Sequence, residues 1–175
     1  MNSKLDLIYR RRSIRTYTSE AVSKDTVLEI VKAGMAAPSG ISRRAWHITI
    51  IEDAALREAI AATSSHRSCC REAPVVYLVS GDSSRFLAEP RAAIAEACWP
   101  QDCAAMVQNL LLAATGLGLG SLWMGVYPGE QNIADMRRLV GLPEHIIPFA
   151  LVAVGHQAEE KEARTTLEEE QLLWK

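Results

Sequence analysis

The segment that most constrains the fold is residues 101–115, which offers almost no polar face to solvent. A helix that is apolar all round has to be buried on every side, so we expect this segment to form the central helix of the molecule. A chain of 175 residues fits one domain and supplies enough chain to surround that helix. The apolar positions are Ala104, Ala105, Val107, Leu110, Leu111, Leu112, Ala113 and Ala114.

Helices and strands alternate on both sides of this segment. A capping box at Ser3 and Asp6 predicts a short first helix that runs into a group of arginines. A second helix is expected from its cap at Ser23 to the stop at Pro38. Caps and helical spacing predict further helices over residues 54–60, 83–97 and 130–140, and apolar or alternating runs predict strands over residues 47–51, 75–80, 121–127 and 148–154. This interleaving indicates an α/β or α+β fold in one domain.

The charges nearly cancel, with 19 Lys and Arg against 21 Asp and Glu, which gives a formal net charge of -2. This balance argues against nucleic acid or an anionic membrane as a partner. The positive charges nevertheless concentrate in residues 10–15 and the negative charges in residues 159–170. No stretch reaches the roughly 18–20 apolar residues of a membrane helix. The first residues also lack the apolar region of a signal peptide, so we expect a cytoplasmic protein.

The motifs give little support to catalysis by side chains or to metal binding. The four histidines lack H-x-x-x-H spacing, and neither a G-x-S-x-G elbow nor a P-loop occurs. Cys69, Cys70, Cys98 and Cys103 match neither a zinc ribbon nor a C-x-x-C motif, so we expect packed, reduced thiols and no metal. Asp102 beside Cys103 lacks a placed histidine. If the chain is an enzyme, a cofactor carries the chemistry and no side chain is catalytic.

Glycines follow the central apolar segment at Gly116, Gly118 and Gly120. They stand between a helix and a strand, whereas the dinucleotide fingerprint stands between a strand and a helix, so we reject a Rossmann loop. We expect Gly116 to end the helix in the left-handed conformation and the other two to allow close backbone approach.

Two polar segments remain as candidate binding sites, and each has two open interpretations. Residues 10–15 form either a solvated basic face or an anion site, since guanidinium groups beside the Ser13 hydroxyl suit a phosphate. The loop over residues 38–42 is either an ordinary polar loop near a core Trp46 or a grip for a flat, hydrogen-bonding heterocycle against that indole.

Five motifs in order resemble the nitroreductase family of flavin-dependent oxidoreductases, and the resemblance covers most of the chain. The family's R-[RH]-S-[IT]-[RK] motif resembles residues 11–15, and its P-S-x-x-N-x-Q-P-W loop resembles residues 38–46. The Q-N-x-x-L-A-A-x-x-x-G-L-G helix is similar to residues 108–118. The W-x-G-x-Y-P strand resembles residues 123–128, and the G-x-x-A-E-E-K-x-x-R segment resembles residues 155–164.

The resemblance implies an α+β fold, an α/β/α sandwich with a central, mostly antiparallel sheet. It implies an FMN-binding domain over residues 1–155 and a C-terminal arm over residues 156–175 that contributes to a homodimer and to the phosphate site. FMN would lie at the dimer interface. The implied cofactor-binding residues are Arg11, Arg12, Ser13, Arg15 and Arg164, with Lys161 a weaker candidate, together with Met124 and Gly125 near the flavin ring and its N5, and Pro38, Ser39 and Ser42 from the other subunit.

The implied reaction is a ping-pong reduction of nitroaromatics, quinones or similar flat acceptors by NADH or NADPH. The alternatives are another flavin reaction of the superfamily, namely reductive dehalogenation or flavin fragmentation, or a non-enzymatic flavin- or nucleotide-binding regulator. Ser42, Arg44 and Ala45 stand where the family usually has Asn, Gln and Pro. Arg43 and Arg44 add positive charge there, so we hypothesise selection of an anionic acceptor or of the NADPH phosphate.

Overall fold

The computed structural model describes residues 5–86 and 92–175. Its centre is a four-stranded sheet with the strand order β1-β2-β4-β3, built from β1 (Trp46–Ile51), β2 (Val75–Asp82), β3 (Gly120–Gly125) and β4 (Ile146–Gly155). All three strand pairs are antiparallel. The two middle strands, β2 and β4, are buried almost throughout, which their continuous apolar sequences predict.

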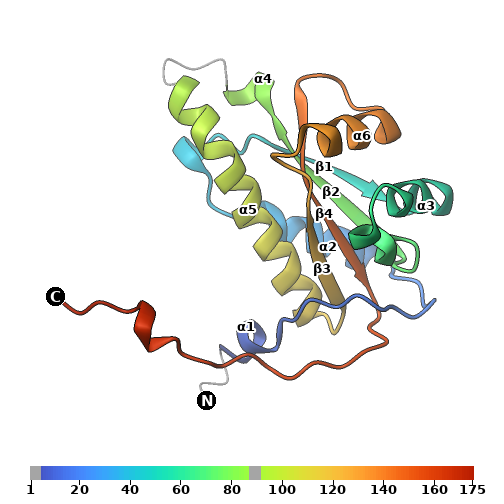
Figure 1. The fold of residues 1–175 in the computed structure, drawn as a ribbon, viewed down its shortest axis with the longest axis vertical. Coiled ribbons are helices and arrows are strands. Elements are labelled where there is room, and N and C mark those ends of the chain that lie inside the picture. The colour runs from blue at the N-terminus through green and yellow to red at the C-terminus, as the bar shows by residue number, and fades with distance from the viewer. Residues whose placement is uncertain (1–4, 87–91) are drawn as a thin grey trace.

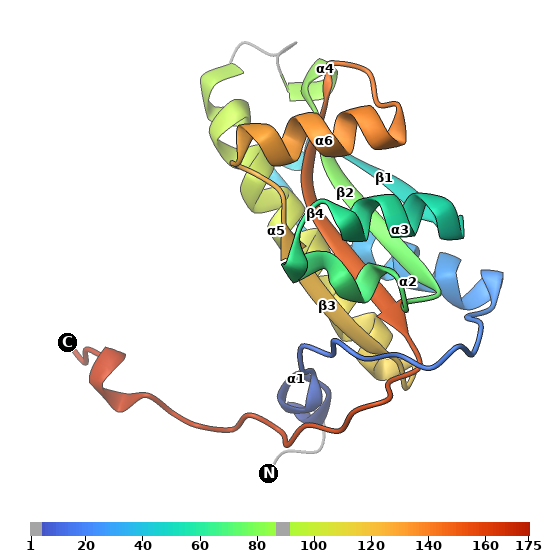
Figure 2. The ribbon, with the colours of Figure 1, turned by 45° about the vertical axis from the view of Figure 1, so that its right-hand side comes forward.

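Helices cover both faces of the sheet and make three layers (Figures 1 and 2). One face packs against α2 (Lys24–Met35) and α5 (Ala92–Gly116). The other packs against α3 (Ala54–Ala62), the 3-10 helix η3 (Ser65–Cys70) and α6 (Glu130–Val140). Side chains of β2 alternate between the layers because successive strand residues point to opposite faces. The expected α/β/α sandwich is confirmed.

The central helix α5 is longer than the sequence predicts. It begins at Ala92 rather than near residue 101 and continues through Pro100. Trp99 explains the extension, because its indole is buried and packs edge-on against Tyr127 and Phe149. Burying so large a side chain stabilises the turn around the proline. The prediction of a separate helix over residues 83–97 was wrong over residues 92–97, which belong to α5. Pro90 lies outside the described residues.

Several local expectations can be compared with the remaining elements. Ser23 and Asp53 cap α2 and α3, and each side chain accepts a backbone N–H bond. The first helix, α1 (Asp6–Arg10), is present, but Ser3 lies outside the described residues. In the turn after α5 the left-handed glycine is Gly118, with φ 77°, and not Gly116. The short elements are η2 (Gly40–Ser42), α4 (Ser83–Phe86) and η4 (Glu169–Gln171). Within the described ranges, no helix has the length and apolarity to cross a bilayer.

Candidate functional site

The residues after α1 form a strap, residues 11–18, that lies along the outer edge of β3. The Ile14 N–H donates to the Ser121 carbonyl at 3.0 Å, which makes a single parallel bridge between Ser13 and Ser121. Ile14 and Tyr17 are buried in the core, and the Tyr17 hydroxyl donates to the Ile14 carbonyl at 2.8 Å. These anchors fix the strap, so the polar side chains between and before them keep a defined position.

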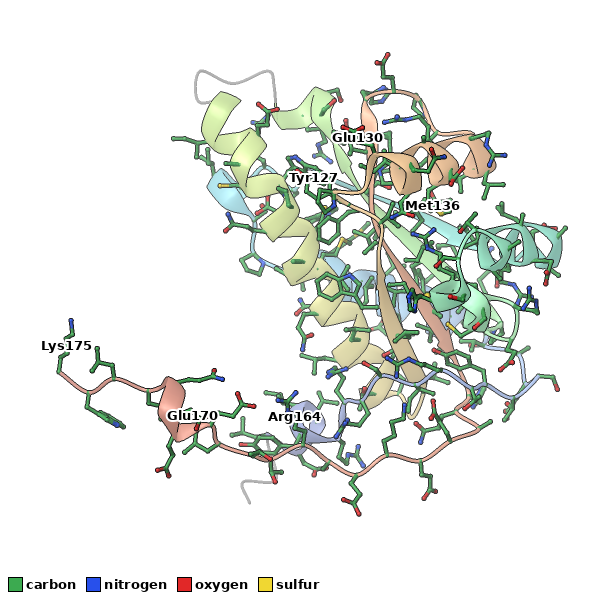
Figure 3. The ribbon with its side chains drawn as sticks, viewed as in Figure 1. Tyr127, Glu130, Met136, Arg164, Glu170 and Lys175 are labelled. Atoms are coloured by element: carbon green, nitrogen blue, oxygen red, sulfur yellow. The ribbon has the colours of Figure 1, made fainter. Side chains whose placement is uncertain are left out.

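The C-terminal arm, residues 156–175, returns beside the strap in the opposite direction. The Ala158 N–H donates to the Thr16 carbonyl at 3.0 Å. The Lys161 ammonium donates to the Ser13 carbonyl at 2.6 Å, and the Arg164 N–H donates to the Tyr9 carbonyl at 3.0 Å. Figure 3 shows Arg164 next to α1, whereas Lys175 lies far from the sheet. The arm therefore brings basic residues from the end of the chain to those near its beginning.

Arg11, Arg12 and Arg164 form an arginine cluster at this junction. The Arg12 guanidinium donates to the Glu162 carbonyl at 2.6 Å, and Arg164 pairs with Glu168 at 2.9 Å. Burial lowers the pKa of Arg11, and the positive charges of Arg12 and Arg164 lower it further. Like charges held this close repel one another, so an anion bound between them would stabilise the arrangement.

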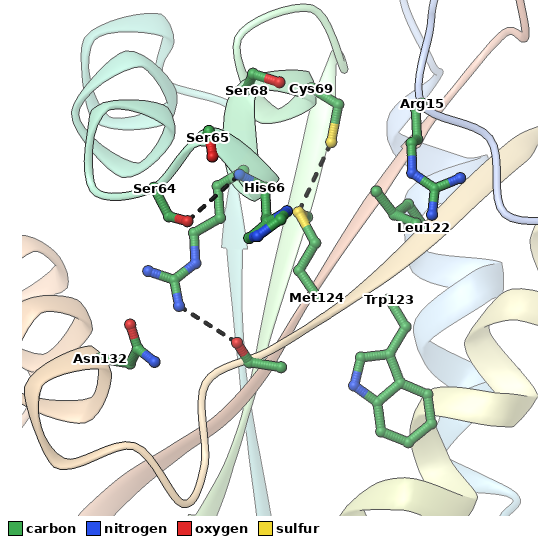
Figure 4. A pocket seen from close by; sticks show the side chains of 12 residues that line it. Arg15, Ser64, Ser65, His66, Ser68, Cys69, Leu122, Trp123, Met124 and Asn132 are labelled. Carbon is green, nitrogen blue, oxygen red and sulfur yellow. Dashed lines mark hydrogen bonds between the residues drawn. The ribbon is translucent and has the colours of Figure 1, made fainter.

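A cavity of about 500 Å³ opens on the other side of the strap. Arg15, Trp123, Met124 and Gly125 line it from the strap and β3, and residues 64–69 line it from the opposite wall (Figure 4). A Cβ atom placed on Gly125 would have no other atom within 4 Å, so the backbone there faces open space. A cavity of this size, with both apolar and polar walls, suits a small planar ligand.

The wall formed by residues 64–69 was not among the sequence-predicted site residues. Its Arg67 is 3% exposed and donates to the Thr63 hydroxyl at 2.8 Å and to the Gly125 carbonyl at 3.3 Å. Asn132 of α6 also lines the cavity. The available signal was the polar run between α3 and the buried strand β2, a composition that is equally typical of an ordinary surface loop.

The loop over residues 38–44 is held by the N-terminal half of α5. The Gly40 N–H donates to Asp102 Oδ1 at 2.7 Å, and a Cβ on Gly40 would lie 2.8 Å from the Cβ of Cys98. The Arg44 N–H donates to the Ser39 hydroxyl at 3.0 Å. Ile41, Ser42 and Arg44 have positive φ of 53°, 55° and 49°. Their strained backbone makes this loop a candidate for function.

The structure divides the sequence-predicted residues into two groups within one chain. The strap and arm bring together Arg11, Arg12, Ser13, Arg15 and Arg164, and β3 adds Met124 and Gly125. Pro38, Ser39 and Ser42 are apart from them, and none of these three lines the cavity. The loop contacts α5 at Asp102, whereas α1 approaches Gly116 through Leu7. The 14 residue steps of α5 from Asp102 to Gly116 span about 21 Å at about 1.5 Å per residue, so the loop and α1 lie about that far apart along the helix.

Comparison with known proteins gives one family for nearly the whole chain. The model of the Nitroreductase family matches residues 8–67 and 64–156. A relative from Methanothermobacter thermautotrophicus is 37% identical over 155 residues, which cover 89% of this chain and 78% of the relative. That relative is provisionally named NADH dehydrogenase/NAD(P)H nitroreductase.

Solved structures agree with the sequence comparison. A provisionally named nitroreductase from Desulfovibrio desulfuricans, solved in complex with FMN, has a TM-score of 0.82 and 32% identity and covers 100% of this chain and 98% of its own. The NADPH:FMN oxidoreductase of Vibrio harveyi, complexed with NAD+, has a TM-score of 0.85 and 25% identity. Its alignment covers 99% of this chain and 77% of the Vibrio chain.

Proposed function

Because the chain belongs to the nitroreductase family, we propose that it is an FMN-dependent oxidoreductase that takes electrons from NADH or NADPH. The proposed acceptors are nitroaromatics, quinones or similar flat molecules, reduced in a ping-pong sequence in which the nucleotide leaves before the acceptor enters. One observation carries this proposal: the arginine cluster and the cavity adjoin the same strap, the cluster at Arg11 and the cavity at Arg15.

The arginine cluster fits the phosphate of FMN. Arg11 is partly desolvated beside two further guanidinium groups, and a phosphate accepts bidentate bonds from such groups. Lys161 already donates to the Ser13 carbonyl and pairs with Glu159 at 3.1 Å, so we assign it to holding the arm against the strap. Arg11, Arg12 and Arg164 are the proposed phosphate ligands.

The cavity fits the flavin ring. Arg15 would supply positive charge at the ring edge, and Met124 and the open backbone of Gly125 would lie against the ring near its N5. When bound, the flavin would supply the hydride chemistry. The chain's own share would be to orient the ring, to exclude water with the wall at residues 64–69, and to place positive charge where the reduced ring is negative.

We also propose a homodimer in which each site takes residues from both chains. The loop with Pro38, Ser39 and Ser42 is held about 21 Å along α5 from the end where α1 lies. Supply of this loop by the partner would bring it to the ring without any rearrangement of the chain. The exposed apolar side chains near the end of the arm suit contact with the partner.

Flavin binding and reduction test the proposal directly. The purified protein should carry a flavin absorption spectrum that NADH or NADPH bleaches under argon. Arg11→Ala should weaken FMN binding by about 10- to 100-fold, the worth of a hydrogen bond to a charged group. Arg10→Ala is the matched control, because Arg10 pairs with Asp6 at 3.0 Å on α1, and it should leave FMN affinity unchanged.

The other outcomes separate the alternatives. Protein that binds FMN but is not bleached by either nucleotide would be a flavin-binding regulator. Colourless protein that takes up no FMN on titration would overturn the proposal. Bleaching without turnover of any nitroaromatic or quinone would favour another flavin reaction of the superfamily.

A further inference from the structure

Three sulfur atoms meet at the inner wall of the cavity. The Cys69 Sγ lies 3.7 Å and the Cys70 Sγ 3.9 Å from the Met124 Sδ. Figure 4 shows the Cys69 contact between η3 and β3. The residues are 5%, 0% and 7% exposed, respectively, so water is nearly excluded from this sulfur triad.

The positive charge of Arg67 lies next to the triad, and its carboxylate neighbour Asp135, which pairs with Arg138, acts on it only from beyond ion-pair distance. The Arg67 side chain is almost fully buried. Among residues 5–86 and 92–175, no carboxylate lies within ion-pair distance of it. The neighbouring Cys69 thiol and burial raise the pKa of Cys70, and the nearby charge of Arg67 opposes only part of that shift. Buried charges are normally paired, so the Arg67 environment favours a negative group at the sulfurs.

A disulfide between the adjacent thiols would not supply that negative group and is disfavoured by geometry. Neighbouring Cα atoms are about 3.8 Å apart, whereas disulfides need about 4.4–6.8 Å. The backbone here is also fixed, because the N–H groups of Glu72 and Ala73 both donate to the Cys69 carbonyl, at 3.2 and 3.0 Å. A bridging ion requires no bond between the two sulfurs and avoids this strain.

We propose that Cys69, Cys70 and Met124 form a binding site for one monovalent soft metal ion, Cu(I) or Ag(I). Thiolate and thioether ligands select such ions. A trigonal ion with bonds of about 2.3 Å, as in zinc thiolates, separates its sulfurs by about 4.0 Å, close to the 3.7 and 3.9 Å found. Binding displaces one proton from each thiol to solvent. The resulting ion and two thiolates carry a single negative charge, which balances Arg67.

Two further observations favour this kind of ion. Among the described residues, no group of three or more His, Cys, Asp and Glu is arranged to hold a metal, so hard and borderline ions lack a comparable site. A divalent ion with two thiolates would be neutral and would add no negative charge beside Arg67. Cys69 and Met124 line the cavity, so an ion can enter there without opening the core.

Metal titration of the purified protein tests the site, because its readout is bound metal and does not depend on the proposed reaction. Under argon, with a Cu(I) chelator as competitor, the protein should bind one Cu(I) per chain with sulfur as the only ligand atom in X-ray absorption. Cys69→Ser and Cys70→Ser should each weaken Cu(I) binding by more than about 100-fold, beyond the loss caused by an outer-shell partner. Cys103→Ser is the matched control, since Cys103 is 0% exposed but lies in the other core cluster.

A second variant keeps the test valid if the serine variants unfold. Met124→Leu conserves volume and removes only the thioether, so it should fold and weaken Cu(I) binding. Ag(I) should compete for the same single site. The proposal is overturned by fewer than one bound ion per chain, by oxygen or nitrogen ligands, or by equal losses in Cys103→Ser.

Discussion

Arg43 and Arg44 are neighbours in the loop after α2, yet their side chains have different surroundings. The Arg43 Nε donates to the Arg85 carbonyl at 3.0 Å. Arg44 is exposed, and its side chain forms no hydrogen bond or ion pair within the described part of the chain. The Arg44 charge is therefore available to a ligand, whereas that of Arg43 is already engaged.

Arg44→Ala should lower kcat/KM with NADPH about tenfold or more and leave kcat/KM with NADH unchanged, because only NADPH carries the additional phosphate. Steady-state kinetics with both nucleotides measure the ratio. Arg43→Ala serves as the control and should change the ratio much less. If Arg44→Ala leaves the preference for NADPH over NADH unchanged, the hypothesis that Arg44 selects the NADPH phosphate is wrong.

Gly81 at the end of β2 lies against the ring of Trp99. A Cβ there would stand 2.5 Å from the indole, which cannot move aside because it packs on Phe149. Gly81→Ala should lower the free energy of unfolding by about 1–3 kcal/mol through overpacking. Gly116→Ala is the control, since its Cβ meets only Leu7 at 3.5 Å, and it should be neutral or stabilising by up to about 1 kcal/mol. Urea unfolding compares the two variants, and equal stabilities would contradict the packing argument.

Single residues of the site were predictable where a local pattern carried them. The strap's arginines and Ser13 stand in one short motif, so their proximity follows from the chain itself. Arg67 and Asn132 come from irregular or polar segments, and only the packing of η3 and α6 places them at the cavity. No local pattern distinguishes such residues from solvated surface residues.

At the scale of elements, the joint between α5 and the loop over residues 38–44 depends on one carboxylate. Burial raises the pKa of Asp102 above its ordinary value, although the hydrogen bond from the Gly40 N–H opposes the shift. A raised pKa means that the folded state binds the proton more tightly than the unfolded state. The associated stability is present below the ordinary pKa of 3.8 and is lost as the pH rises through the folded pKa.

Asp102→Asn should therefore gain stability relative to the wild type as the pH rises from about 4 to 7. The amide keeps an oxygen acceptor for Gly40 but carries no charge to desolvate. Urea unfolding at several pH values measures the difference, with Glu96→Gln on the exposed side of α5 as the control. A variant that is less stable than the wild type at pH 7 would mean that the charged hydrogen bond outweighs the cost of burial.

The elements themselves follow from the sequence more closely than their ends and contacts do. The apolar runs of β2 and β4 and the caps of α2 and α3 are local signals, and the structure has all four elements. The first turns of α5 depend on Trp99 packing across the sheet, and the pairing of strap and arm joins residues about 150 positions apart, as in Arg12 with Glu162. Such contacts leave no periodic pattern in either segment.

At the scale of the whole molecule, the arm ends in apolar side chains that face solvent. Leu173 is 78% and Trp174 91% exposed. Exposed apolar groups of this size are typical of an interaction surface. The boundary between the FMN-binding domain, residues 1–155, and the arm, residues 156–175, stays a prediction. The first half of the arm is bound to the strap of the same chain.

Replacing both Leu173 and Trp174 by Ala should shift the protein from dimer towards monomer and weaken FMN binding, since the proposed sites lie between subunits. Light scattering coupled to gel filtration measures the mass. The paired substitutions Glu169→Gln and Glu170→Gln are the control in the same arm and should preserve the dimer. A wild-type protein that is monomeric and binds FMN at full affinity would contradict the proposed assembly.

The separation of the loop from the arginine cluster has a genetic consequence. If each site takes Arg11 from one chain and Ser39 from the other, a cell that makes an Arg11→Ala chain and a Ser39→Ala chain together would form mixed dimers with one undamaged site and one doubly damaged site. With random pairing, roughly a quarter of all sites would be undamaged. Two alleles that are each defective alone would then complement each other.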